Sequence, residues 1–164
     1  MTDAATVPMP PDDAIEVLAR CIHEDYLASL DERDLGVPSH LDWDDLGERE
    51  RELNRNQARD NVRKLAAVGI EVVAEVPEGA VVVDALDDDT VEAMAQEEHR
   101  RWMAHRKAQG YRYGPTRVDT PPDLQHPDIV AWAELTEEAR DKDRRPVRTF
   151  PAHLRTAGLV MVRR

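Results

Sequence analysis

An internal repeat restricts the possible folds of this chain more than any other feature of its sequence. Two stretches match at a constant offset of 89 residues, so a position in one copy predicts a structural equivalent in the other. An earlier stretch, 18–28, matches 94–104 at an offset of 76, and the difference of 13 predicts a longer loop in the second copy, over 110–128. The matches at the larger offset pair Trp43 with Trp132, Leu46 with Leu135, Glu48 with Glu137, Arg51 with Arg140, Arg55 with Arg144, Arg59 with Arg148, Leu65 with Leu154, Gly69 with Gly158 and Val73 with Val162.

Apolar spacing predicts the same order of elements in each copy. An opening helix, at about 14–29 or 90–108, leads through a loop to a short helix at Trp43 or Trp132, then to a second helix and a strand. Gly69 and Gly158 follow the second helices, where a residue that tolerates positive φ is favoured. We therefore predict a mostly helical α+β fold made of two pseudo-symmetric repeats with a small β element.

The expected boundaries follow from the repeat. Residues 1–13, which are rich in proline and aspartate, are predicted to be a disordered leader. The repeats are expected at 14–76 and 90–164, as one compact unit with a pseudo-two-fold axis. Two β-branched runs flank a Pro-Glu-Gly turn and predict a hairpin over 72–83, and residues 77–89 are expected to form the connecting hairpin or linker. The run 87–90 predicts an acidic N-cap for the second opening helix.

Composition excludes several classes of function. The formal net charge of −12 argues against binding to a nucleic-acid backbone. The single cysteine, Cys21, cannot form an intramolecular disulfide, and the N-terminus has no long apolar run, so we expect a soluble cytoplasmic protein with no membrane span. No nucleophile motif, glycine-rich phosphate loop or metal-ligand spacing occurs. The sequence therefore predicts no catalytic residue, metal or cofactor.

The second copy carries a distinctive series of short motifs, at 99–102, 110–115, 126–127, 132–135, 143–144 and 157–159. The first copy repeats this series less completely. Together the two copies resemble the RyR domain, which occurs in pairs in ryanodine receptors. The resemblance implies that an adenine nucleotide is held in the cleft between two copies, with its base between Tyr26 and Trp102. Asn54 and Asp143 would then lie near the ligand. The first copy lacks the Gly-aromatic loop, so any role of that loop is carried over to the second copy alone.

Basic residues supply candidates for phosphate binding. Arg106 follows Trp102 by one helical turn and so shares its face. Asp143 is predicted to cap a helix with Pro146 in its first turn, which would place Arg144 and Arg145 beside free backbone N–H groups. The candidate ligand residues are thus Tyr26, Trp102, Asn54, Arg55, Arg106, Arg117, Asp143 and Arg144.

Structural alternatives exist for most of these residues. Tyr26 and Trp102 are equally consistent with core or interface positions, and the arginines with solvated ion pairs. His23 and His99 are interpreted as structural, and Trp43 and Trp132 as core anchors. The preferred interpretation is a non-catalytic sensor of a purine nucleotide or nucleotide-derived signal. The alternatives are a protein-interaction or homodimerisation module, with a second copy or a larger effector protein as its partner, and an enzyme that acts on nucleotides.

Overall fold

The computed structural model describes residues 6–30 and 40–164, and its contacts divide the chain into two compact units. One unit comprises residues 1–86 and 148–164, and the other comprises residues 87–147. These boundaries differ from those of the predicted repeats, because the end of the last helix and the final strand group with the first unit.

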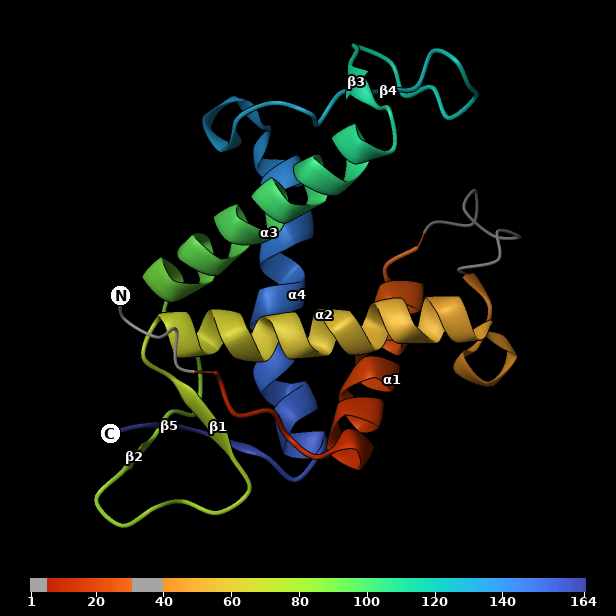
Figure 1. Cartoon of the computed structure of the whole chain (residues 1–164). Coiled ribbons are helices and arrows are strands. Elements are labelled where there is room, and N and C mark those ends of the chain that lie inside the picture. Colours follow the sequence, from red (N-terminus) through yellow and green to blue (C-terminus); the bar gives the residue numbers. More distant parts are fainter. Residues whose placement is uncertain (1–5, 31–39) are drawn as a thin grey trace. The chain divides into compact units, whose positions relative to one another are not determined.

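The first unit is built on a packed pair of helices. Helix α1 (Asp12–Ala28) contacts α2 (Glu48–Ala67), and the 3₁₀-helix η3 (Trp43–Asp45) precedes α2 (Figure 1). Residues 6–11 of the predicted leader form no helix or strand, yet Pro10 is buried, and α1 starts two residues earlier than expected. The unit also contains β1 (Glu71–Val73), β2 (Val81–Val82), the end of α4 (Glu137–Thr156) and β5 (Val160–Arg163).

Helical spacing explains the core of this unit. Buried side chains recur three or four residues apart along each helix, as an apolar face requires. They are Ile15, Leu18 and Ala19 on α1, Ala58, Val62 and Leu65 on α2, and Phe150 and Leu154 on α4. Burial of one large aliphatic or aromatic side chain contributes about 1.5–3 kcal/mol to stability.

In the sheet of the first unit, the equivalent strands of the two copies pair with each other. Strand β5 lies between β1 and β2 and is antiparallel to both (Figure 1). Val72 faces Met161, with Glu71 opposite Val162 and Val73 opposite Val160. The 89-residue offset makes Val72 the equivalent of Met161. A local two-fold axis that passes through this pair therefore relates β1 to β5.

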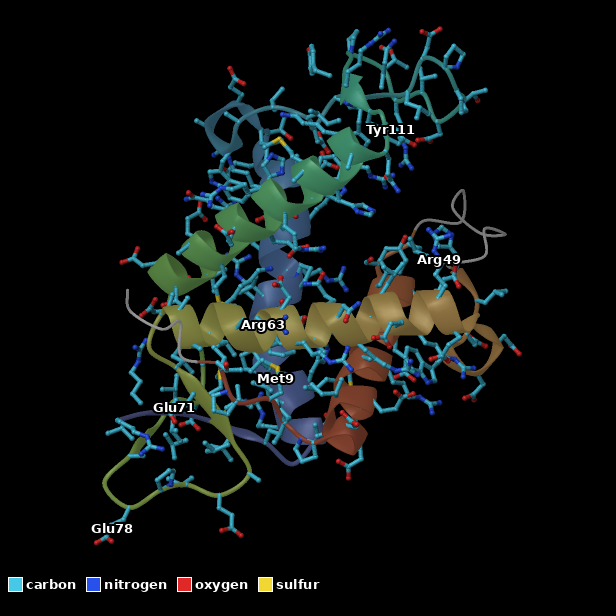
Figure 2. The ribbon with its side chains drawn as sticks, in the orientation of Figure 1. Met9, Arg49, Arg63, Glu71, Glu78 and Tyr111 are labelled. Carbon is cyan, nitrogen blue, oxygen red and sulfur yellow. The ribbon has the colours of Figure 1, made fainter. Side chains whose placement is uncertain are left out.

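The predicted hairpin between residues 72 and 83 is wrong. Both strands form, but they pair with β5 rather than with each other. The turn itself is present, since the Ala80 N–H donates to the Pro77 carbonyl at 3.1 Å and Glu78 lies at the tip of the loop (Figure 2). The apolar β5 takes the central position, where Met161 and Val162 are buried, whereas β2 exposes Val81 at an edge.

The second unit contains the second opening helix and the long loop. Helix α3 (Asp88–Ala108) is capped by the Asp87 carboxylate, which accepts the Thr90 N–H at 2.7 Å and confirms the predicted cap. Strands β3 (Arg112–Tyr113) and β4 (Gln125–His126) pair in parallel, and η4 (Trp132–Glu134) precedes α4. The predicted order of helices is thus confirmed in both copies. Gly69 and Gly158 have φ angles of +80° and +74°, as predicted.

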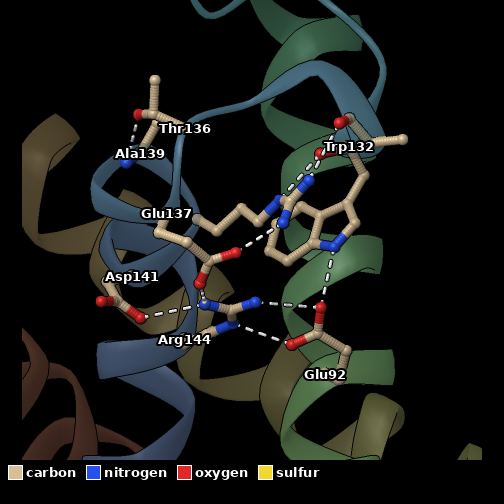
Figure 3. Close-up of polar contacts among 9 residues, drawn as sticks. Glu92, Trp132, Thr136, Glu137, Ala139, Asp141 and Arg144 are labelled. Carbon is tan, nitrogen blue, oxygen red and sulfur yellow. Dashed lines mark hydrogen bonds and ion pairs between the residues drawn. The ribbon is translucent and has the colours of Figure 1, made fainter.

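The helix start predicted at Asp143 is wrong. Helix α4 is continuous from Glu137 to Thr156, and the Thr136 hydroxyl accepts the Ala139 N–H at 3.1 Å at its N-terminal end (Figure 3). Pro146 therefore lies inside the helix, where it removes one backbone donor without ending the helix. Arg144 and Arg145 consequently have no free helix N-terminus beside them.

No helix in the described part of the chain combines the length and apolar character that a membrane span needs.

Candidate functional site

The two copies share a set of polar contacts that fix the short helices. The Arg51 Nε donates to the Trp43 carbonyl at 3.2 Å, and the Arg140 Nε donates to the Trp132 carbonyl at 3.0 Å. Each guanidinium also donates through Nη2 to the next carbonyl along the chain, at 2.9 Å in both copies. These equivalent bonds agree with the repeat inferred from the sequence.

Arg55 and Arg144, both predicted to bind phosphate, are each paired with three carboxylates. Arg144 contacts Glu92 at 2.8 and 3.1 Å, Glu137 at 2.7 Å and Asp141 at 3.2 Å (Figure 3). The matching partners of Arg55 are Glu16, Glu48 and Glu52. Hydrogen bonds from the two arginines hold the pKa values of Glu16 and Glu92 below their ordinary range. Both guanidiniums therefore serve the fold of their own copy.

His23 and His99 anchor the loops that follow the opening helices. Both side chains are buried, and each Nε2 lies within hydrogen-bond distance of a loop carbonyl, Leu41 at 2.6 Å and Val130 at 2.8 Å. These contacts agree with the structural interpretation of both histidines. Trp43 is a core residue, as expected, whereas Trp132 is only partly buried and donates its indole N–H to a carboxylate.

Three further candidate ligand residues, Tyr26, Asn54 and Asp143, make contacts with different partners. Tyr26 is 44% exposed, and its hydroxyl lies 3.0 Å from His40 Nε2. Asn54 donates through its side-chain amide to the Glu50 carbonyl of the preceding helical turn, at 3.0 Å. Asp143 places a carboxylate oxygen 3.5 Å from His99 Nδ1.

The C-terminal half of α3 brings together four aromatic rings and one arginine. The His99 ring stacks on Trp102 with centroids 5.8 Å apart, and the His126 ring meets Trp102 edge-on at 4.8 Å. The Arg106 guanidinium carbon lies 5.8 Å from the Trp102 centroid and 5.1 Å from the Tyr111 centroid. Such contacts place a cation against aromatic faces, where it is attracted by their quadrupoles.

Arg106 differs from the other arginines at candidate positions. Its Nε is buried and makes no hydrogen bond, and its one hydrogen bond to a described residue runs from Nη1 to Gln109 at 3.4 Å. A buried donor without an acceptor is costly, and arginine is well suited to binding phosphate in a bidentate manner. Among the described residues Arg106 therefore has no carboxylate partner, in contrast to Arg55 and Arg144.

The long loop is anchored beside this cluster. Tyr111 follows the end of α3 (Figure 2), and its hydroxyl donates to Asp119 at 2.8 Å. Arg117 donates to the other oxygen of Asp119 at 2.8 Å. The hydrogen bond from Tyr111 lowers the pKa of Asp119 and raises that of Tyr111. A Cβ at Gly114 would lie 2.0 Å from the Gln125 Oε1, so the pairing of β3 with β4 requires glycine there.

His126 lies among several cations. Burial lowers the pKa of this imidazole; Asp128 opposes that shift, and Arg117, Arg106 and Lys142 add to it. Its Nδ1 accepts the Asp128 backbone N–H at 3.1 Å, which leaves Nε2 to carry the proton of the neutral ring. The Nε2 donor of His126 thus lies among charges of both signs, with Asp128 opposing the three cations.

The order of these elements matches a known family. The model of the RyR domain matches residues 79–162, which is more than half of the 164-residue chain. The chain belongs to the RyR domain family. The match spans α3, the long loop, α4 and most of β5, so the Trp102 and Arg106 cluster lies inside the RyR domain. Comparison with curated proteins found no match.

Sequence reasoning missed two members of the cluster. Tyr111 and His126 were noted only as parts of motifs, yet both rings contact the residues selected as ligand-binding. Their positions in the motifs were the available signal. Among the described residues, no group of histidine, cysteine and acidic side chains has the arrangement of a metal site.

Proposed function

We propose that this RyR domain protein is a non-catalytic module that captures a purine nucleotide, or a signal derived from one, in the cytoplasm. Trp102 contacts the base and Arg106 contacts a phosphate. The observation that carries the proposal is the Arg106 guanidinium, which lies against Trp102 and Tyr111 with its buried Nε unpaired.

Energetic considerations support this pairing of base and phosphate. Stacking of a base on an aromatic side chain contributes about 1–3 kcal/mol and tolerates different bases. Hydrogen bonds between a guanidinium and a phosphate are charge-assisted and are stronger than neutral ones. A ligand that offers both a flat base and a phosphate thus satisfies both halves of the cluster.

The first copy contributes differently. We propose that it forms a tandem pair with the matched RyR domain and supplies Tyr26 as the second aromatic residue for the base. The 76-residue offset makes Leu30 the equivalent of Arg106, so the first copy has no cation at that position. This asymmetry supports one ligand per chain. Asn54 and Asp143 are proposed to contact the base or ribose, and Asp143 is expected to meet a hydroxyl or amino group.

A protein-interaction module is the second candidate function. The observation that favours it is an apolar pocket of about 340 Å³ in the first unit, lined in part by Val76, Val82 and Leu159. Val81 and Val82, on the neighbouring edge strand, are 66% and 44% exposed. This alternative, which includes homodimerisation, predicts no stabilisation by nucleotides.

A thermal-shift panel tests the leading proposal. Adenine and guanine nucleotides, cyclic nucleotides and ADP-ribose derivatives are added to the wild-type protein and to the Trp102→Leu variant. A ligand present at about one hundred times its dissociation constant adds about 2.7 kcal/mol to stability. We expect one nucleotide class to raise the melting temperature of the wild type and not of the variant. If none of these ligands shifts the wild type, the proposal fails and the protein-interaction alternative gains.

A further inference from the structure

A second cation lies next to the Arg106 cluster and is held by the same tyrosine. Arg117 donates through Nε to Asp119, and the other oxygen of Asp119 accepts the Tyr111 hydroxyl. The ring of Tyr111 lies 5.1 Å from the Arg106 guanidinium carbon. Tyr111 and Asp119 therefore connect two guanidiniums, and they keep Arg117 in place on a loop with little regular structure.

The outer donors of Arg117 are well placed for a ligand. Its side chain is 57% exposed, and among the described residues its hydrogen bond and ion pair involve Nε alone, so both terminal nitrogens are available to a ligand. Lys142, 71% exposed and 3.9 Å from Asp128, adds a third positive charge near His126. Two carboxylates, Asp119 and Asp128, partly offset these three cations.

His126 lies among charged side chains from three elements. Positive charge from Arg117, Arg106 and Lys142 acts on His126 from the loop, from α3 and from α4. Asp128 acts on the same ring in the opposite direction, so the geometry that bears on a ligand is that of the two guanidiniums, Arg106 against the Tyr111 ring and Arg117 on the Asp119 carboxylate that Tyr111 also holds. A second guanidinium beside Arg106 offers bidentate, charge-assisted hydrogen bonds to a second anionic group.

We propose that the ligand of this site carries a diphosphate or longer phosphate chain, with one phosphate on Arg106 and the next on Arg117. His126 donates from Nε2 to the same chain. This inference rests on the proposed nucleotide-binding function and narrows it from nucleotides in general to nucleoside diphosphates and their derivatives. Asp119 is a positioning residue, because it fixes Arg117 without itself meeting the phosphate.

Calorimetric titration of the full chain tests the inference. The probes are adenosine, AMP, ADP and inorganic pyrophosphate, with the guanosine series run in parallel. We expect ADP to bind about tenfold more tightly than AMP, since a further charge-assisted contact forms. Arg117→Gln should abolish that preference and leave the affinity for AMP unchanged. Arg112→Gln, which removes an exposed arginine of the same loop, should leave the preference intact.

The outcomes separate this inference from the proposed function. If AMP and ADP bind equally, or if Arg117→Gln weakens both to the same extent, the diphosphate inference is overturned while nucleotide binding stands. If pyrophosphate binds in an Arg117-dependent manner and no nucleoside or nucleotide binds more tightly, the phosphate site stands and the purine proposal fails. If neither pyrophosphate nor any nucleotide binds, both are overturned.

Discussion

The guanidinium carbon of Arg106 lies 5.8 Å from the centroid of the Trp102 ring, one turn away on the same helix. Arg144, in contrast, is held by three carboxylates. We therefore predict opposite phenotypes for the two arginines. Arg106→Gln should weaken nucleotide binding about tenfold or more with little change in melting temperature. Arg144→Gln should lower the melting temperature by a few degrees and change affinity much less.

Two measurements check this contrast, a thermal melt and a calorimetric titration of each variant with ADP. Arg101→Gln serves as the matched control, because Arg101 lies on the same helix and contacts Glu98 of the preceding turn. If the Arg144→Gln protein folds normally and loses as much affinity for ADP as Arg106→Gln, Arg144 binds the ligand as well as its three carboxylates.

A second prediction concerns His99, which is buried and bonded to the Val130 carbonyl. His99→Leu leaves that carbonyl without its donor and should reduce the free energy of unfolding by about 1–3 kcal/mol. Chemical denaturation measures the change. The exposed His105 offers a control on the same helix, and His105→Leu should be close to neutral. Equal stability of the two variants would contradict the anchoring role of His99.

The close approach of two strands gives a third prediction. An alanine Cβ at position 114 would lie 2.8 Å from the Gln125 Cβ as well as 2.0 Å from its Oε1, so the clash involves more than a mobile side-chain end. Gly114→Ala should therefore cost about 1–3 kcal/mol and speed amide hydrogen exchange in residues 110–128. Gly47→Ala meets only the movable carboxylate of Glu50 and should be tolerated. Unchanged exchange in the loop of Gly114→Ala would refute the steric argument.

The fourth prediction is a dependence of stability on pH near neutrality. Burial lowers the pKa values of His126 and His153 below their ordinary value of 6.5. Between the folded value and about 6.5 the unfolded chain binds more protons, so the free energy of unfolding rises with pH in that window. The contribution is complete above about 6.5 and is lost as the pH falls through the folded values.

Denaturation at a series of pH values from 7.5 to 5 tests this sign. The double variant His126→Gln, His153→Gln should show a flatter profile than the wild type. Carboxylates with lowered pKa values, such as Glu92 and Asp119, act only in a more acidic range and do not obscure the effect. A wild-type profile that is as flat as that of the variant would contradict the assigned histidines.

Much of the fold is predictable from the sequence because each element of the repeat can be inferred from two copies. The repeat that pairs Arg55 with Arg144 also predicts that their partners correspond, and Glu16 and Glu92 do occupy equivalent positions, at the offset of 76 residues that relates the opening helices. The wrong hairpin has a physical cause. Strand pairing depends on burial across the whole chain, and β5, about eighty residues downstream, competes for the edges of β1 and β2.

The candidate site was less accessible to sequence reasoning. Periodicity on α3 correctly places Arg106 beside Trp102, because the spacing of a helix fixes its neighbours. The long loop has no such periodicity, so the contacts of Tyr111 and His126 could not be derived from spacing. The predicted cap at Asp143 is wrong because Pro146, which the prediction places in a first helical turn, is the tenth residue of the continuous helix α4.

The dissociation constant of ADP for variants of Trp102 tests the central claim most directly. Trp102→Phe keeps a flat ring and should bind nearly as tightly as the wild type, whereas Trp102→Leu should lose about tenfold, as expected when a stacking contact disappears. Tyr113→Leu, which removes an exposed aromatic ring of the same unit, is the control and should bind normally. If the folded Trp102→Leu protein binds ADP as tightly as the wild type, Trp102 does not hold the base and the account of this site is wrong.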